Sequence, residues 1–175
     1  MRAVARELDE MGIPFAIAGA LAGNAHGHRR MTEDVDLLLT REGLARFKQS
    51  KLGLGWVELF AGSKGMRDTT NNVKLDILLA GDFPGDGKPK PVVFPDPAAL
   101  QPDRRDGLPF IDLPLLLELK LASGMTAPHR LQDLADVMSL IRVRALPQDY
   151  SDHLNPYVRG KFQEMWALAQ VQDEY

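Results

Sequence analysis

Three aspartates in two apolar stretches are the residues whose type and spacing best suit chemistry. Asp34 and Asp36 lie two apart in DVDLLL, and Asp76 lies in VKLDILL. Side chains alternate between the faces of a strand, so an extended DVDLLL directs both aspartates to one face. Adjacent carboxylates repel unless a cation neutralises them, and Mg²⁺ prefers oxygen ligands. If the two stretches are neighbouring strands in register, Asp76 completes a cluster able to hold Mg²⁺ or Mn²⁺ for phosphoryl transfer.

An Asp-x-Asp pair is weak evidence when taken alone, because an aspartate on the polar face of an edge strand is equally natural. The apolar surroundings favour the metal interpretation. The apolar residues of VKLDILL and DVDLLL predict that much of each strand is buried. An unpaired carboxylate is costly to bury. We therefore expect some group to neutralise these aspartates.

A glycine before an alanine-rich segment is the second candidate feature. Gly19 ends the apolar run PFAIAG and is followed by Ala20. A glycine at a strand-to-helix turn lets backbone N–H groups approach a phosphate. The alternative is that Gly19 only permits a tight turn.

Positive charges with nearby aspartates form the third feature. Lys120 lies in the apolar stretch LPLLLELKLASG, and Arg130 precedes Asp133 and Asp136. The functional interpretation is that Lys120 and Arg130 neutralise triphosphate oxygens while the aspartates orient them. The alternative is an amphipathic helix with Arg–Asp pairs on its surface. Arg30 is open to the same two interpretations, as a phosphate or substrate contact or as a solvated charge.

The elements that would position these residues follow from periodicity and turn signals. Thr40 is a predicted N-cap for the helix that follows DVDLLL. The 63–72 segment is polar and turn-like, and 82–109 is mostly loop with a short strand at 92–94. The predicted strands are 14–19, 34–39, 56–62 and 73–81, and the predicted helices are 2–11, 20–25, 41–51, 113–123, 127–144 and 155–172.

The predicted fold class is α/β (α+β), a mixed β-sheet flanked by helices. Its core spans 1–112, and a helical C-terminal region, 113–175, packs on that core. The 175 residues are 45% hydrophobic and 26% charged, which is ordinary for a globular protein. No stretch approaches the roughly 18 apolar residues of a membrane span, and the N-terminus lacks the apolar core of a signal peptide.

Composition excludes several function classes. The absence of cysteine excludes disulfides, thiolate-bound zinc, iron–sulfur clusters and a cysteine nucleophile, and it fits a cytoplasmic protein. A net charge of −3 disfavours extensive binding to duplex nucleic acid. A local basic pocket for one triphosphate remains compatible with that charge.

These motifs together resemble the nucleotidyltransferase superfamily, most closely the AbiEii-type branch of bacterial nucleotidyltransferase-like proteins. The segment AGALAGNAHGHRRMTEDVDLLL is similar to the family's glycine turn and Asp-x-Asp strand, and VKLDILL to its third carboxylate strand. The resemblance spans roughly residues 13 to 140. The other matched positions are Arg30 and Thr32 before the strand, Lys120 and Arg130, and then Asp133 and Asp136.

The resemblance implies transfer of a nucleoside monophosphate from an NTP to an acceptor hydroxyl of a tRNA end, a protein or a small molecule. It implies Mg²⁺ or Mn²⁺ on the three aspartates and, as one biological role, the toxin of a pair with an antitoxin as partner. Nucleotide binding would fall to Gly19, Ala20, Arg30, Lys120, Arg130 and Asp133.

One departure from the family pattern concerns the glycine turn. Relatives carry glycine or serine where this chain has Ala20, and a serine there donates a hydroxyl to phosphate. A non-catalytic nucleotide- or partner-binding relative therefore stays open. A metal-dependent hydrolase using the same carboxylates on a phosphoester is the other alternative.

Overall fold

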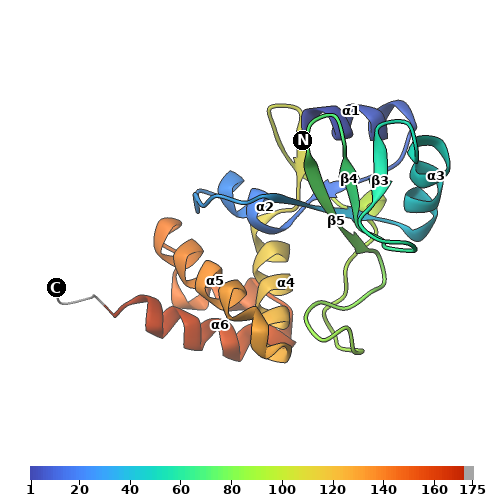
Figure 1. Cartoon of the computed structure of the whole chain (residues 1–175). Helices are drawn as coiled ribbons and strands as arrows, with labels where there is room; N and C mark the ends of the chain where they lie inside the picture. The colour runs from blue at the N-terminus through green and yellow to red at the C-terminus, as the bar shows by residue number, and fades with distance from the viewer. Residues whose placement is uncertain (172–175) are drawn as a thin grey trace.

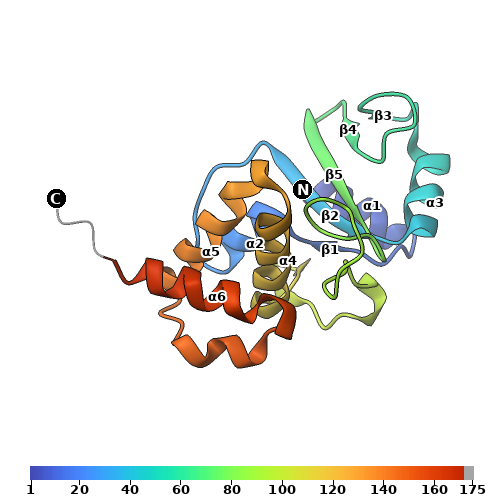
Figure 2. The ribbon, with the colours of Figure 1, turned by 90° about the horizontal axis from the view of Figure 1, so that it is seen from below.

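The computed structural model describes residues 1–171, in which a seven-stranded mixed sheet lies between two groups of helices (Figures 1 and 2). The strand order is β3-β4-β5-β2-β1-β7-β6; β2 and β5 run parallel, as do β1 and β7, and the other neighbours are antiparallel. The strands are β1 (Ala16–Ile17), β2 (Asp34–Leu39), β3 (Trp56–Glu58), β4 (Met66–Asp68), β5 (Val73–Leu79), β6 (Asp103–Arg105) and β7 (Leu108–Phe110).

Helices cover both faces of the sheet and also build the C-terminal third. No helix within residues 1–171 combines the length and apolar character needed to cross a membrane. The α-helices are α1 (Arg2–Glu10), α2 (Gly19–Ala25), α3 (Arg41–Lys51), α4 (Leu113–Thr126), α5 (Leu131–Val143) and α6 (Pro156–Ala169). Short 3-10 turns are η1 (Pro97–Ala99), η2 (Pro128–Arg130) and η3 (Gln148–His153).

The predicted α/β (α+β) class is confirmed, whereas the division between 112 and 113 stays a prediction.

The alternation of side chains along β2 and β5 divides the hydrophobic core in two. Leu37 and Ile77 belong to the cluster beneath α1 and α3. Leu38 lies in the other cluster, which includes α2 and the helices α4, α5 and α6, and Leu78 packs against it. The polar face positions of β2 and β5 therefore point toward the α4–α6 side, where Lys120 and Asp136 also lie.

Helix α4 is buried on nearly all sides because it lies between the sheet and the other C-terminal helices (Figure 2). Its N-cap is Asp112, whose carboxylate accepts a hydrogen bond from the Leu115 amide, and Pro114 lies in the first turn. An apolar sequence around the whole helix suits this position. The consequence is that Lys120, in the middle of α4, is only 5% exposed.

Several predicted boundaries agree with the structure, including 34–39 as β2 and 41–51 as α3, whose N-cap Thr40 accepts a hydrogen bond from the Gly43 amide. The predicted strand at 14–19 is shorter, because Ala16–Ile17 alone pairs. The predicted strand at 56–62 likewise ends at Glu58, where the chain turns.

The turn and loop predictions were wrong in three places. Met66–Asp68, inside the 63–72 segment predicted as a turn, is strand β4, with Met66 fully buried. Strand β6 and the first two residues of β7 lie within 82–109, which was predicted to be mostly loop. Residues 92–94 form no strand but attach to the end of β5 through backbone hydrogen bonds of Phe94. Pairing partners distant in sequence created these strands, so local composition did not reveal them.

The helical third was predicted with the right number of long helices but different ends. Helix α4 continues to Thr126, and the predicted helix 127–144 begins with the 3-10 turn Pro128–Arg130 before α5. Helix α6 ends at Ala169, and residue 172 of the predicted 155–172 helix lies outside the described residues.

Candidate functional site

The parallel pairing of β2 with β5 brings the three predicted aspartates to one face of the sheet. Asp36 is directly opposite Asp76, and Asp34 is directly opposite Lys74. Because side chains at positions two apart share a face, Asp34, Asp36 and Asp76 all point to the side that carries α4. The three aspartates therefore share one face of the sheet, as predicted, while their roles stay predictions.

A lysine lies between two of these carboxylates. Lys74 Nζ is 2.8 Å from Asp34 Oδ2 and 3.4 Å from Asp76 Oδ2. The hydrogen bond to Asp34, helped by the charge of Asp76, raises the pKa of Lys74 and keeps it charged. With this arrangement, no group of three His, Asp or Glu side chains within residues 1–171 is placed to hold a metal ion.

Asp36 is the carboxylate whose ionisation the protein disturbs most. Part of the side chain is exposed, but protein atoms surround most of the carboxylate. Burial raises the pKa of Asp36 to about 6, and repulsion from Asp76 adds to the effect. Lys120 and Arg130 oppose it incompletely. A carboxylate in this state gains from any further cation placed beside it.

This raised pKa gives a pH-dependent stability. A folded-state pKa of about 6, above the ordinary 3.8, means that the folded protein binds the proton more tightly than the unfolded chain. The contribution of Asp36 is therefore most favourable below about pH 4 and is lost as pH rises to about 6. We expect the metal-free wild type to lose about 2–3 kcal/mol relative to Asp36→Asn across that range. Urea denaturation at several pH values measures this, and parallel curves for the two proteins would contradict it.

Gly19 makes the close approach of Asp36 possible. It has φ of +57°, the left-handed region that favours glycine, and it begins α2 directly after β1. A Cβ atom at this position would overlap the carboxylate of Asp36. Gly19 is thus required both for the turn and for the space that Asp36 occupies. Its amide and that of Ala20 are among the first N–H groups of α2, which have no partner inside the helix.

We expect Gly19→Ala to destabilise the protein by about 2–4 kcal/mol, because it adds backbone strain to the overlap with Asp36. Gly12→Ala is the matched control: Gly12 has φ of +60° but no atom within 4 Å of an added Cβ. Strain alone should cost this control about 1 kcal/mol. Chemical denaturation compares the two, and equal losses would show that contact with Asp36 is unimportant.

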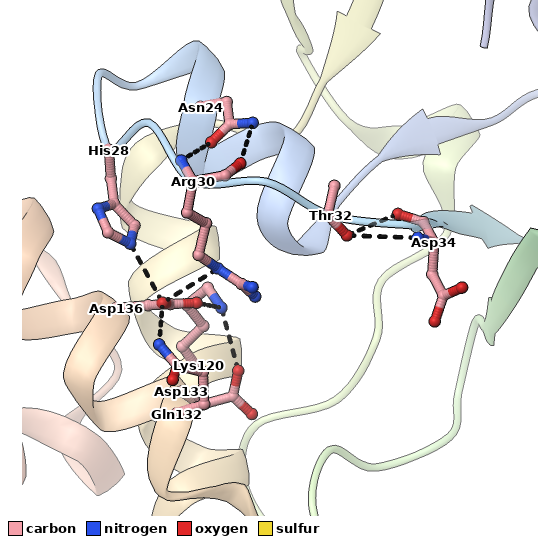
Figure 3. Close-up of polar contacts among 9 residues, drawn as sticks. All are labelled: Asn24, His28, Arg30, Thr32, Asp34, Lys120, Gln132, Asp133 and Asp136. Carbon is pink, nitrogen blue, oxygen red and sulfur yellow. Dashed lines mark hydrogen bonds and ion pairs between the residues drawn. The ribbon is translucent and has the colours of Figure 1, made fainter.

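A buried carboxylate, Asp136, organises the basic side of the site (Figure 3). It is 0% exposed, and its Oδ2 accepts a hydrogen bond of 2.6 Å from Lys120 Nζ. Its Oδ1 accepts a 2.9 Å bond from Gln132 and lies 3.1 Å from His28 Nε2. Burial alone would raise the pKa of Asp136, but Lys120, then Gln132 and Arg30, outweigh it and hold that pKa below its usual value. Asp136 is therefore a charged anchor for cations.

Arg30 is one of those cations, although the sequence left its role open. Its Nε is 3.3 Å from Asp136 Oδ1, an ion pair that lacks hydrogen-bond geometry. The loop backbone is fixed as well, since the Asn24 side-chain amide exchanges hydrogen bonds of 2.9 and 3.0 Å with the backbone of Arg30. Figure 3 shows His28 and Arg30, from the loop between α2 and β2, and Lys120, from α4, converging on Asp136. Arg30 is thus a positioned group and not a freely solvated charge.

Asp133 also contacts Lys120, as predicted, whereas Arg130 differs from the prediction. Asp133 Oδ1 accepts a 3.0 Å bond from Lys120, and its Oδ2 accepts a 2.7 Å bond from Ser123. Within residues 1–171, Arg130 forms no ion pair with Asp133 or Asp136, so the expected orientation of Arg130 by these aspartates was wrong. The reason is that Arg130 ends a 3-10 turn, one residue before α5 begins. Its side chain is exposed.

A single pocket collects most of the predicted residues. It has a volume of about 140 Å³ and opens between the start of α2, the polar face of β2 and helix α4. One side is apolar, formed by Leu78, Phe94, Ile111, Leu116 and Leu119. The predicted site residues that line it are Gly19, Ala20, Arg30, Asp36, Lys120, Arg130 and Asp133. Asp34 and Asp76 do not line it, but Asp76 is the register partner of Asp36.

Sequence patterns missed residues that support the site. Asn24, Ser123 and Gln132 are uncharged polar residues in helices, and no sequence motif marks them as part of a site. His28 likewise has no local signal, because its contact with Asp136 spans 108 positions. Thr32, just before β2, donates a 3.0 Å hydrogen bond from its hydroxyl to the carbonyl of Asp34.

The side chains on this face suit a hard divalent cation by their chemistry. Asp36 and Asp76 are opposed carboxylates on adjacent strands. Burial of Asp36, with repulsion from Asp76, raises the pKa of Asp36, so a cation placed beside it would favour its ionised form. The third carboxylate, Asp34, is engaged by Lys74. A cation at Asp36 and Asp76 would meet Lys74 only at Asp76 Oδ2, 3.4 Å from Lys74 Nζ, whereas recruitment of Asp34 requires Lys74 to move.

No known protein-family profile matches the chain, and no curated protein sequence matches it significantly. Function is therefore inferred from the site itself.

Proposed function

We propose that this protein is a metal-dependent nucleotidyltransferase, which moves a nucleoside monophosphate from an NTP to an acceptor hydroxyl. The observation that carries the proposal is the opposition of Asp36 and Asp76 beside a pocket lined by Gly19, Lys120 and Arg30. Carboxylates for a divalent cation and cations for phosphate oxygens meet there across elements distant in sequence. That combination suits phosphoryl transfer better than any hydrolytic triad.

In the proposed reaction, the acceptor oxygen attacks the α-phosphorus of the NTP. The bond from that phosphorus to the bridging oxygen of the β-phosphate breaks, and pyrophosphate leaves. Asp76, the most exposed of the three aspartates at 44%, takes the proton of the acceptor hydroxyl as general base. Mg²⁺ or Mn²⁺ on Asp36 and Asp76, joined by Asp34, would supply charge stabilisation for the phosphoryl oxygens.

The pocket supplies the remaining interactions with the nucleotide. Lys120 and Arg30 are held by Asp136, and Arg130 lines the same pocket with an exposed side chain, so three positive charges face the triphosphate oxygens. The amides of Gly19 and Ala20 at the start of α2 would add hydrogen bonds to phosphate. The apolar side of the pocket suits the nucleobase.

The acceptor is a hydroxyl of an RNA end, a protein or a small molecule. We place the activity in the cytoplasm, where NTPs are present and where a cysteine-free chain is at no disadvantage. The biological role we propose, on the family resemblance alone, is that of a toxin with an antitoxin as partner.

A second candidate is a nucleotide- or partner-binding protein without catalysis. Ala20 favours it, since no side-chain hydroxyl stands where a serine would contact phosphate, and so does the engagement of Asp34 by Lys74. Isothermal calorimetry separates the two candidates, because a binder would release heat on NTP addition without producing pyrophosphate.

The direct test uses purified protein, Mg²⁺, a cell extract and each NTP labelled at either the α- or the γ-phosphate. We expect label from one α-labelled NTP on a macromolecule or small product, and none from the γ-labelled NTP. Label released only as free phosphate or free nucleotide would indicate a phosphoester hydrolase and would reject the proposal.

A further inference from the structure

Lys74 has no part in the reaction proposed above, yet it lies inside the carboxylate array formed by Asp34, Asp36 and Asp76. It is the residue of β5 directly opposite Asp34. Its Nζ bridges Asp34 and Asp76 at 2.8 and 3.4 Å, and about a third of its side chain is exposed, at 34%. Both of its carboxylate partners are half-exposed as well, at 37% and 44%.

The ammonium group meets the same electrostatic demand as a divalent cation. It is a compact charge with three donors, and it neutralises carboxylate oxygens from two adjacent strands. The register of β2 and β5 fixes the backbone of Lys74 directly opposite Asp34. Its ammonium group can therefore leave Asp34 only if the Lys74 side chain changes conformation. A metal ion that uses Asp34 or the Oδ2 atom of Asp76 must therefore displace Lys74.

We propose that Lys74 is a built-in competitor of the metal ion, and that it weakens divalent-cation binding by occupying Asp34 and Asp76. The inference rests on the proposed function in one respect, that the carboxylate array is the metal site. It predicts weak binding of free metal ions, with full engagement of Asp34 coupled to movement of Lys74.

A purely structural salt bridge is the competing explanation, and the two make opposite predictions. Half-exposed ion pairs contribute little to stability, so a structural Lys74 would change neither folding nor metal affinity much when replaced. A competitor, in contrast, changes metal affinity in a definite direction: removal of its positive charge leaves three carboxylates free and strengthens attraction for the cation.

The test is a Mn²⁺ titration followed by electron paramagnetic resonance of the free ion. We expect Lys74→Met to bind Mn²⁺ about tenfold or more tightly than the wild type. Lys74→Arg keeps the charge and should stay within about threefold. Lys64→Met is the matched control at an exposed lysine and should equal the wild type. Unchanged thermal unfolding of Lys74→Met confirms that the comparison is between folded proteins.

A second measurement follows Lys74 itself. Reductive ¹³C-methylation keeps the lysine charge, and we expect Mg²⁺ to shift the Lys74 methyl resonance while that of Lys64 stays in place. Equal or weaker Mn²⁺ binding by Lys74→Met, or a Lys74 resonance that ignores Mg²⁺, overturns the inference.

These outcomes separate the inference from the proposed function. Tighter Mn²⁺ binding by Lys74→Met without any nucleotide transfer by the wild type would sustain the competitor role and reject the enzyme. Nucleotide transfer by the wild type, with unchanged Mn²⁺ affinity in Lys74→Met, would sustain the enzyme and reject the competitor role. A failure of every variant to bind Mn²⁺ would overturn both.

Discussion

Asp36→Asn is expected to lower nucleotide transfer by about a thousandfold, because the amide cannot supply the negative charge that holds the cation, a loss of about 4 kcal/mol at the transition state. Asp36 is the central carboxylate: it faces Asp76 across the strands, touches the Gly19 turn and lines the pocket. The substitution keeps the size and shape of the side chain. The measurement is the rate of label transfer from the α-labelled NTP at saturating Mg²⁺.

The same variant should be more stable than the wild type above pH 6. Burial and Asp76 make the ionised Asp36 unfavourable in the metal-free fold, and asparagine removes that charge. Asp106→Asn is the control, since Asp106 is exposed and asparagine tolerates its φ of +51°. Full nucleotide transfer by Asp36→Asn would show that the reaction does not need the Asp36 carboxylate. Loss of transfer with loss of stability would instead point to a damaged fold.

Lys120→Met is expected to destabilise the protein by about 3–5 kcal/mol, the cost of leaving a buried charge without its partner. Asp136 is fully buried and would lose its shortest hydrogen bond, 2.6 Å, although Gln132, His28 and Arg30 would remain. The effect should therefore fall toward the lower end of that range. Urea denaturation at pH 7 measures it.

Two further variants test the cause of this loss. Lys161→Met removes a lysine from a surface pair with Glu164 on α6 and should cost less than about 0.5 kcal/mol. The double variant Lys120→Met/Asp136→Asn should recover at least half of the loss, because the fully buried carboxylate that lost Lys120 is then uncharged, even though Arg30 loses its ion pair. A double variant as unstable as the single one would show that Lys120 matters through packing and not through charge.

Much of the architecture was predictable because the signals were local. The alternation in DVDLLL and VKLDILL identified β2 and β5 and assigned the aspartates to their polar faces, and Thr40 marked the start of α3. The prediction for the β4 segment was wrong because Met66–Asp68 forms a strand through its pairing with β3 and β5, which its own composition does not indicate. The predicted pairing of Arg130 with the aspartates was wrong for a different reason. Pro128 begins a 3-10 turn that places Arg130 before α5.

The sequence by itself determined which residues could do chemistry and which face of its own strand each aspartate occupies, because side-chain alternation depends only on the local backbone. Only the tertiary structure decided which of them meet. The parallel register placed Asp36 opposite Asp76 and Lys74 opposite Asp34, and the packing of α5 against α4 buried Asp136 between Lys120 and Arg30. These contacts join positions 16 to 106 residues apart, and their energies depend on burial, which no local pattern contains.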